Sequence, residues 1–392
     1  MRLARRHLLL ATAGASAALA APALAQRGGG AGATREVTDV AGRTVRVPRE
    51  VRRVLLGEGR LTYAVAALDR EAPFARVVGW RDDLKKNDPD TYAAYRARWP
   101  EADRLPTFGG VKDGTFDVEQ AIALRPDVVL MNLEARAATE EARLDAKLAA
   151  VGVPVAYVDF RDQPSVNTEP SLRLLGAVLG REERAAALIA YRREGIARVT
   201  DRLAATPDLR RPRVMVERAG GYDAGCCMSF GGDNFGRMVA EAGGENIAAR
   251  LIPGTFGVVN PEQVVASDPE VVVVTGSNWS IPAPGGAWVG VGPGADPSAA
   301  RERLARLMDR PAYRPLRVAR SGRVHAIWHQ FYDSPYQFVA VQALATWLHP
   351  SLFGDLDPDA TFRDFHERFL PVAYRPGYWV SLPERQAALA PR

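Results

Sequence analysis

Short apolar runs alternate with amphipathic segments along most of the chain. The strand candidates are residues 51–56, 75–79, 127–131, 153–159, 213–217, 271–275 and 323–327. The helix candidates are residues 61–68, 116–124, 139–151, 235–242, 261–266, 299–308 and 336–348. Strands that read as continuous apolar runs and alternate with helices are typical of parallel sheets covered on both faces. The pattern therefore predicts an α/β fold.

One segment between the two series of strands has a different character. From Arg181 to Ala205 there is no proline and only one glycine, Gly195, and good helix formers dominate. A helix of this length would be roughly 37 Å long, enough to cross a whole domain. It is either an ordinary surface helix or a rigid connector between two lobes.

An internal repeat favours the connector. The stretch Glu119–Leu130 aligns with Glu262–Val273, and half of the aligned positions are identical. Each copy predicts a helix, a break at proline and a buried strand. Two copies on either side of a long helix indicate two similarly built α/β lobes that are joined once.

Composition and charge narrow the function classes. The chain has 392 residues, of which 47% are hydrophobic, so it is long enough to bury a large core. Its formal net charge is +5, which falls to +2 without Arg2, Arg5 and Arg6. No further cluster of Lys and Arg indicates nucleic-acid binding. The sequence also lacks a phosphate-binding loop, a zinc-protease motif and a serine-hydrolase elbow, so we predict no catalytic residues.

The N-terminus has the pattern of an export signal. Met1–His7 is basic, Leu8–Ala21 is apolar, and Ala23–Ala25 fits a cleavage site. The pair Arg5-Arg6 favours the twin-arginine route, with the general secretory route as the alternative. We predict a signal peptide over 1–25, cleaved near Ala25, a flexible lead-in over 26–36, and a periplasmic mature protein.

Several motifs together resemble a known family. They are the paired E-x-x-x-A-x-x-P-[DE]-V-V units, the helix between them, the opening Val37–Val45, and the segments Trp328–Pro335 and Ala345–Pro350. Their order resembles class III periplasmic substrate-binding proteins of ABC importers, the group that binds iron-siderophore, haem and cobalamin ligands. The resemblance implies two Rossmann-like lobes joined by a single long α-helix, with a ligand cleft between the lobes. The expected boundaries are 37–168 for the N-terminal lobe, 169–206 for the connecting region, 207–376 for the C-terminal lobe and 377–392 for a tail.

The resemblance also implies partners and a ligand class. The expected protein is a monomer that captures an iron(III) complex and delivers it to a membrane permease with its cytoplasmic ATPase. A haem, cobalamin or nickel complex is an alternative ligand, and an exported metal-dependent α/β enzyme is an alternative function. No set of metal-ligating residues is identified.

Candidate ligand-binding residues follow the predicted strands, because ligands of open α/β sheets gather beyond the carboxyl ends of strands. The candidates are Arg60, Trp80, Arg81, Lys112, Arg161, Tyr222, Cys226, Cys227, Trp279, Trp328, His329 and Tyr332. Guanidinium groups suit anionic oxygens, and aromatic rings supply flat apolar contact. This mixture favours a bulky anionic chelate over a bare cation.

Two further pairs of residues have open roles. Cys226 and Cys227 are adjacent and form a strained disulfide, bind a soft metal, or are simply buried. Glu119 and Glu262 begin the two repeated units. The resemblance implies that they dock onto arginines of the permease, although a glutamate is also favoured at a helix N-terminus by the helix dipole.

Overall fold

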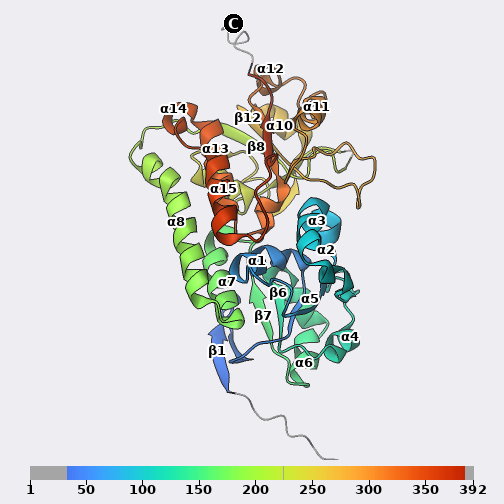
Figure 1. The fold of residues 1–392 in the computed structure, drawn as a ribbon. Helices are drawn as coiled ribbons and strands as arrows, with labels where there is room; N and C mark the ends of the chain where they lie inside the picture. The colour runs from blue at the N-terminus through green and yellow to red at the C-terminus, as the bar shows by residue number, and fades with distance from the viewer. Residues whose placement is uncertain (1–32, 224, 385–392) are drawn as a thin grey trace, which may run out of the picture.

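The protein folds into two α/β lobes, the N-lobe and the C-lobe, which are the lower and upper halves of Figure 1. The computed structural model describes residues 33–223 and 225–384, so the expected signal peptide lies outside the described residues. The N-lobe sheet has the strand order β5-β4-β3-β6-β7 and is entirely parallel. The C-lobe sheet has the order β10-β8-β12-β13-β14, in which β14 runs antiparallel to β13. The predicted fold class is confirmed.

The N-lobe follows an N-terminal hairpin of two strands. The strands up to the connector are β1 (Thr34–Thr38), β2 (Thr44–Pro48), β3 (Val54–Leu56), β4 (Val77–Arg81), β5 (Thr107–Phe108), β6 (Val128–Asn132) and β7 (Val155–Val158). The helices are η1 (Gly59–Leu61), α1 (Thr62–Leu68), α2 (Asp83–Asn87), α3 (Pro89–Arg98), η2 (Pro100–Arg104), α4 (Val118–Ala123), η3 (Leu133–Ala135), α5 (Arg136–Glu141), α6 (Leu144–Ala149) and α7 (Pro164–Leu179).

The C-lobe follows the helix α8 (Glu182–Ala204). Its strands are β8 (Arg213–Glu217), β9 (Met228–Phe230), β10 (Glu245–Asn246), β11 (Phe256–Val258), β12 (Val271–Gly276), β13 (Val324–Trp328) and β14 (Trp379–Ser381). Its helices are α9 (Phe235–Glu241), α10 (Pro261–Ser267), α11 (Pro297–Leu307), α12 (Arg317–Ser321), η4 (His329–Asp333), α13 (Gln337–Leu348), α14 (Pro350–Phe353) and α15 (Pro358–Phe369). No helix among the described residues is both long and apolar enough to cross a membrane.

The repeated unit forms the same structure in both lobes. Every residue of β6 and of β12 is buried, which explains why both strands read as unbroken apolar runs. The helix before each strand begins at a polar cap. The Asp117 side chain accepts a hydrogen bond from Gln120 N, and the Asn260 side chain accepts one from Glu262 N. The internal repeat therefore marks equivalent helix–strand units.

Helix α8 is the connector that the sequence predicts over residues 181–205. It is preceded by Gly180, whose φ of 62° lies in the left-handed region that ends α7 and turns the chain. Figure 1 shows α8 running along one side of the molecule beside both lobes. Because the connector is one helix, packed against α7 and α13, it limits how far the lobes can move apart.

Gly195 allows close contact between the connector and the C-lobe. A Cβ atom at this position would lie 2.6 Å from Cδ2 of Phe338, which is on α13. The Gly195 carbonyl also accepts a hydrogen bond of 2.8 Å from Nε2 of Gln342. Glycine is thus required here by helix–helix packing, although it is a poor helix former.

Three local predictions are corrected by the structure. Strand β1 begins at Thr34, inside the segment expected to be a flexible lead-in. The helix predicted over 139–151 is two short helices, because Arg143 adopts a left-handed φ of 50°. Strand β14 pairs with β13, so the C-lobe sheet extends into the segment expected to be a tail from residue 377.

We predict that Gly195→Val lowers the free energy of unfolding by about 2–3 kcal/mol, because the added methyl groups overpack the contact with Phe338. Urea unfolding measures the effect. The control is Ala190→Val at an exposed position of the same helix, where only helix propensity changes and the loss is below about 1 kcal/mol. Equal losses at the two positions would contradict tight packing at Gly195.

Candidate functional site

The carboxyl ends of the parallel strands bring polar loops of the two lobes together. In the N-lobe, Arg60 follows β3 and Arg161 follows β7. In the C-lobe, Arg218 follows β8, and the segment that starts at His329 follows β13. This is the edge at which open α/β sheets bind ligands.

A buried group of charges joins the lobes. We call Glu58, Arg60, Asp83, Glu134, Arg161 and Asp333 the interlobe cluster. Asp333 is its member from the C-lobe. Its Oδ2 lies 2.6 Å from Nη2 of Arg161 and 3.2 Å from Nη1 of Arg60.

Carboxylates of the N-lobe also accept hydrogen bonds from both arginines. Arg60 donates to Glu58 at 2.5 Å and to Asp83 at 2.7 Å. Arg161 donates to Glu134 at 2.6 Å and also to Glu58. Both guanidinium groups therefore have carboxylate partners before any ligand arrives.

The cluster shifts the ionisation of its acids in opposite directions. Burial alone would raise the pKa of Glu58, but Arg161 and Arg60 outweigh burial and hold that pKa well below its usual range. Burial raises the pKa of Asp333 to about 7, against the opposing attraction of Arg161. Burial also raises the pKa of Asp83, so Asp333 and Asp83 are the acids of the cluster whose protonated form is favoured by burial.

A pocket of about 240 Å³ lies beside the cluster, between the lobes. It is lined by Arg60 and Asn87 of the N-lobe and by Arg218, Ala219, Tyr222, Trp279, His329, Gln330 and Tyr332 of the C-lobe. No carboxylate is among these lining residues. The pocket wall is therefore basic and aromatic.

Four rings form one continuous wall of the pocket. Tyr222 packs edge-on against Trp279 at 5.2 Å, and Trp279 packs edge-on against His329 at 5.3 Å between ring centroids. The rings of His329 and Tyr332 are tilted by 35°, with 4.3 Å between their centroids. Nδ1 of His329 lies 2.8 Å from Oγ1 of Thr275. Burial, with the nearby Arg218, holds the pKa of His329 well below its usual range, so its imidazole is neutral at pH 7.

Arg218 differs from the two arginines of the cluster. Its guanidinium lies 4.4 Å over the ring of Phe256, and its Nη1 is 2.7 Å from Sδ of Met228. No carboxylate within residues 33–223 and 225–384 forms an ion pair with it, and its buried Nε lacks a hydrogen-bond partner. Burial lowers the pKa of Arg218, and repulsion from Arg161 adds to that effect. An anion in the pocket would supply the missing partner.

The structure brings together five of the residues predicted from the sequence. Arg60, Tyr222, Trp279, His329 and Tyr332 all line the pocket.

Two predicted aromatic residues are corrected. Trp80 is fully buried and packs against Phe74 and Tyr92, so its ring is part of the core. Trp328 is also buried and packs edge-on against Tyr63, outside the pocket. Both rings follow the sequence rule for strand ends, but the apolar contacts of each ring direct it inward.

Three predicted cations have other partners. Arg161 is bonded within the interlobe cluster, Arg81 pairs with Asp113 at 2.8 Å, and Lys112 pairs with Glu134. None of the three lines the pocket.

Cys226 and Cys227 form a disulfide in this structure. Cys227 is fully buried and Cys226 packs against the same apolar cluster, which includes Val259. Neither lines the pocket. The pair therefore lies at the end of the loop that carries Tyr222 and does not itself reach the ligand space.

Sequence reasoning missed Asn87, Arg218 and Gln330, which also line the pocket. Arg218 directly follows the predicted strand over 213–217, so the strand-end rule was sufficient to include it. Gln330 lies between the predicted His329 and Tyr332, so the same rule could have included it, whereas Asn87 carried no comparable signal. They meet because Gln330 Nε2 donates to the Asn87 carbonyl at 2.9 Å, a contact between the lobes.

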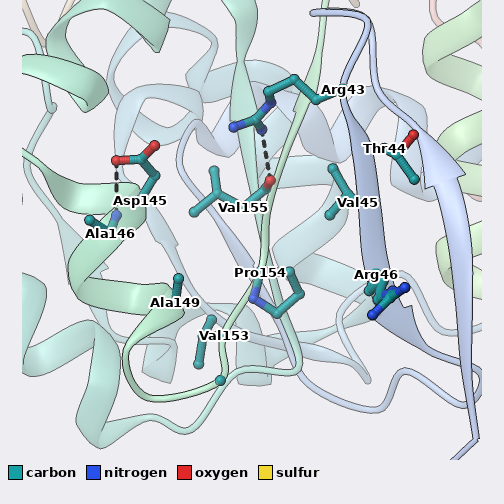
Figure 2. Close-up of a pocket in the computed structure, with 11 residues that line it drawn as sticks. Arg43, Thr44, Val45, Arg46, Asp145, Ala146, Ala149, Val153, Pro154 and Val155 are labelled. Carbon is teal, nitrogen blue, oxygen red and sulfur yellow. Dashed lines mark hydrogen bonds between the residues drawn. The ribbon is translucent and has the colours of Figure 1, made fainter.

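A larger hollow of about 440 Å³ lies on the N-lobe, between β2, α6 and β7 (Figure 2). Its two arginines are already paired, Arg43 with Asp39 at 2.8 Å and Arg46 with Glu36 at 3.0 Å. Figure 2 shows Arg43 directed at the Val155 carbonyl. The C-lobe contributes nothing to this hollow, so the interlobe pocket is the better candidate site.

Comparison with known proteins agrees with this architecture. Residues 82–329, more than half of the chain, match the family model described as periplasmic binding protein. The chain belongs to the periplasmic binding protein family. A TroA-like periplasmic binding protein from Veillonella parvula, FepB, superposes with a TM-score of 0.79 at 26% identity, covering 89% of this chain and 99% of that one.

Two named relatives differ in how much of the chain they match. A cobalamin-binding protein from Halobacterium salinarum is 30% identical over 176 residues, which is 44% of this chain and 44% of that relative. The molybdate-binding protein MolA from Haemophilus influenzae is 22% identical over 371 residues, 88% of this chain and 93% of MolA. The match to the cobalamin-binding protein thus spans less than half of its length.

We predict that Arg161→Gln lowers the free energy of unfolding by about 3–5 kcal/mol, because Glu58 and Asp333 lose a buried counter-charge. Chemical unfolding measures the loss. The control is Arg306→Gln, which removes an exposed pair with Glu302 and should cost at most about 1 kcal/mol. A cost for Arg161→Gln within the range of the control would contradict the buried network.

Proposed function

We propose that this periplasmic binding protein captures an anionic metal complex between its lobes and delivers it to an ABC importer. The complex we favour is an iron(III) chelate of the siderophore type, taken up in the periplasm and passed to a permease with its ATPase. The observation that carries the proposal is the interlobe pocket, in which Arg218 has no carboxylate partner among the described residues and shares the lining with aromatic rings.

The lining chemistry supports an anion with flat apolar parts. Arg218 and Arg60 offer donors to anionic oxygens, and Tyr222, Trp279 and Tyr332 offer aromatic surface. The neutral imidazole of His329 adds a donor or a metal ligand without adding charge. A bare cation would meet two guanidinium groups and is disfavoured.

The volume of the pocket supports a second candidate ligand, a compact metal oxyanion. At about 240 Å³ the pocket is smaller than the range of about 300–1,000 Å³ that is usual for drug-sized ligands. It has room for a small oxyanion, or for the anionic end of a larger chelate if the lobes open further. MolA, a relative along most of the chain, is named for molybdate, and the shorter match is named for cobalamin.

An exported metal-dependent enzyme is the alternative function, and it makes a different prediction. A binding protein releases its ligand unchanged, whereas an enzyme converts it. Mass spectrometry of the compound recovered after binding separates the two.

We predict that Trp279 reports ligand binding. Adding iron(III) citrate or sodium molybdate to the wild-type protein should change its tryptophan fluorescence, and Trp279→Phe should lose most of that change because Trp279 lines the pocket. Trp80→Phe is the control, because Trp80 is buried in the N-lobe core. A signal that survives in Trp279→Phe and disappears in Trp80→Phe would place the ligand elsewhere.

We propose that Glu119 and Glu262 dock the protein onto the permease. Both are exposed and lie in the first turn of equivalent helices, α4 and α10. A helix that precedes a parallel strand runs antiparallel to it, so its N-terminus lies at the carboxyl edge of the sheet. The two glutamates therefore belong to the same edge of each lobe as the pocket, where a two-subunit permease can contact both lobes together.

We predict that Glu119→Ala with Glu262→Ala leaves the affinity for the ligand unchanged and lowers reconstituted uptake, with smaller losses for each single change. Arg replacements should be worse, because repulsion is added to the loss of an interface pair. Ligand titration beside uptake into proteoliposomes measures both. Normal uptake by the double variant would remove the glutamates from the mechanism, and lost ligand affinity would move them into the binding site.

A further inference from the structure

Asp333 occupies a position that an anionic ligand would also favour. A single oxygen, Oδ2, lies within 3.2 Å of guanidinium nitrogens of both Arg60 and Arg161. Its side chain is only 2% exposed. Arg60 also lines the pocket, and Tyr332, the neighbour of Asp333 in the chain, packs against both guanidinium groups. The carboxylate is thus adjacent to the ligand space.

The contact of Asp333 with the two arginines is a contact between the lobes. Arg60 and Arg161 belong to the N-lobe, together with Glu58, Asp83 and Glu134, which move with the arginines. Asp333 belongs to η4 of the C-lobe. A separation of the lobes would move Asp333 away from both arginines, which would then have one anionic oxygen fewer. Buried charges tolerate such a loss poorly unless another anion replaces it.

We propose that Asp333 competes with the anionic group of the ligand for Arg60 and Arg161 and thereby determines specificity. This inference rests on the proposed function. A ligand is accepted when it presents an anionic oxygen that replaces Asp333 on Arg60 and Arg161. Such an oxygen comes from a free metal oxyanion or from a carboxylate, catecholate or hydroxamate group of an iron(III) chelate. A neutral ligand supplies no such oxygen, so displacement of Asp333 would leave both arginines with one carboxylate fewer, and the ligand is rejected.

The ionisation of Asp333 supplies an independent readout. The charged and titratable groups around it are Glu58, Arg60, Asp83, Glu134 and Arg161 of the N-lobe and Arg218, His329 and Tyr332 of the C-lobe. Burial raises the pKa of Asp333 to about 7, whereas the pKa values of Glu58 and His329 are held well below their usual ranges. As pH falls from 8 to 6, Asp333 therefore loses its charge and competes less strongly for the arginines.

The test is titration of Asp333→Asn with two probes, sodium molybdate for the free oxyanion and iron(III) citrate for the chelate. We expect Asp333→Asn to bind at least one probe more tightly than the wild type at pH 7.5, by on the order of tenfold, within the usual range of coupling between sites. The probe whose affinity increases identifies the source of the anion, a free oxyanion or a chelate. Asp333→Glu should restore wild-type affinity. The remote control Asp355→Asn removes an exposed carboxylate, paired with Arg202, and should change nothing.

A pH series with molybdate and iron(III) citrate provides the second measurement, and its wild-type part does not depend on the folding of any variant. Affinity of the wild type for the probe it binds should rise as pH falls from 8 to 6, and Asp333→Asn should lose this dependence. If the wild type binds a probe but Asp333→Asn binds it no more tightly, or if the wild-type affinity does not change with pH, only the role of Asp333 is overturned. Binding of neither probe by either protein would overturn the anionic ligand and the competition together.

Discussion

The site depends on the pairing of buried arginines of the N-lobe with a carboxylate of the C-lobe. Arg60 and Arg161 are removed from water at the interface, and three buried or nearly buried carboxylates, Glu58, Asp83 and Asp333, surround them. Such a network tolerates the loss of a partner poorly. Arg218 is the exception nearby, a guanidinium without a carboxylate partner among the described residues. Within the part of the chain that the structure describes, Arg218 is thus a charged group of the pocket lining without an oppositely charged partner.

The fold creates this arrangement by simple means. Two parallel sheets direct the carboxyl ends of their strands toward each other, so the loops after β3, β7, β8 and β13 converge. The connector α8 holds the lobes in register through its packing on α13 at Gly195. A binding site built from two lobes responds to ligand by small changes in their separation, which a helical connector permits within limits.

The sequence predicted the architecture well because its signals are local. Buried strands read as apolar runs, and the repeat of Glu119–Leu130 in Glu262–Val273 revealed two equivalent units. Site residues were predicted less well. The strand-end rule selected Trp279 and His329, which line the pocket, but it also selected Trp80, whose ring packs into the core. Arg161 pairs with Asp333, which is far away in the sequence, and no local sequence pattern predicts this pair. Whether an arginine is free for a ligand depends on such contacts.

Anomalous diffraction from crystals of the protein purified from its native cells tests the central claim most directly. Data collected at the iron and molybdenum absorption edges locate the bound metal and identify it. The account predicts one metal peak in the interlobe pocket, with ligand oxygens bonded to Arg218 and an aromatic contact to Trp279. A peak in the hollow of Figure 2, or one in contact with a single lobe, would contradict it.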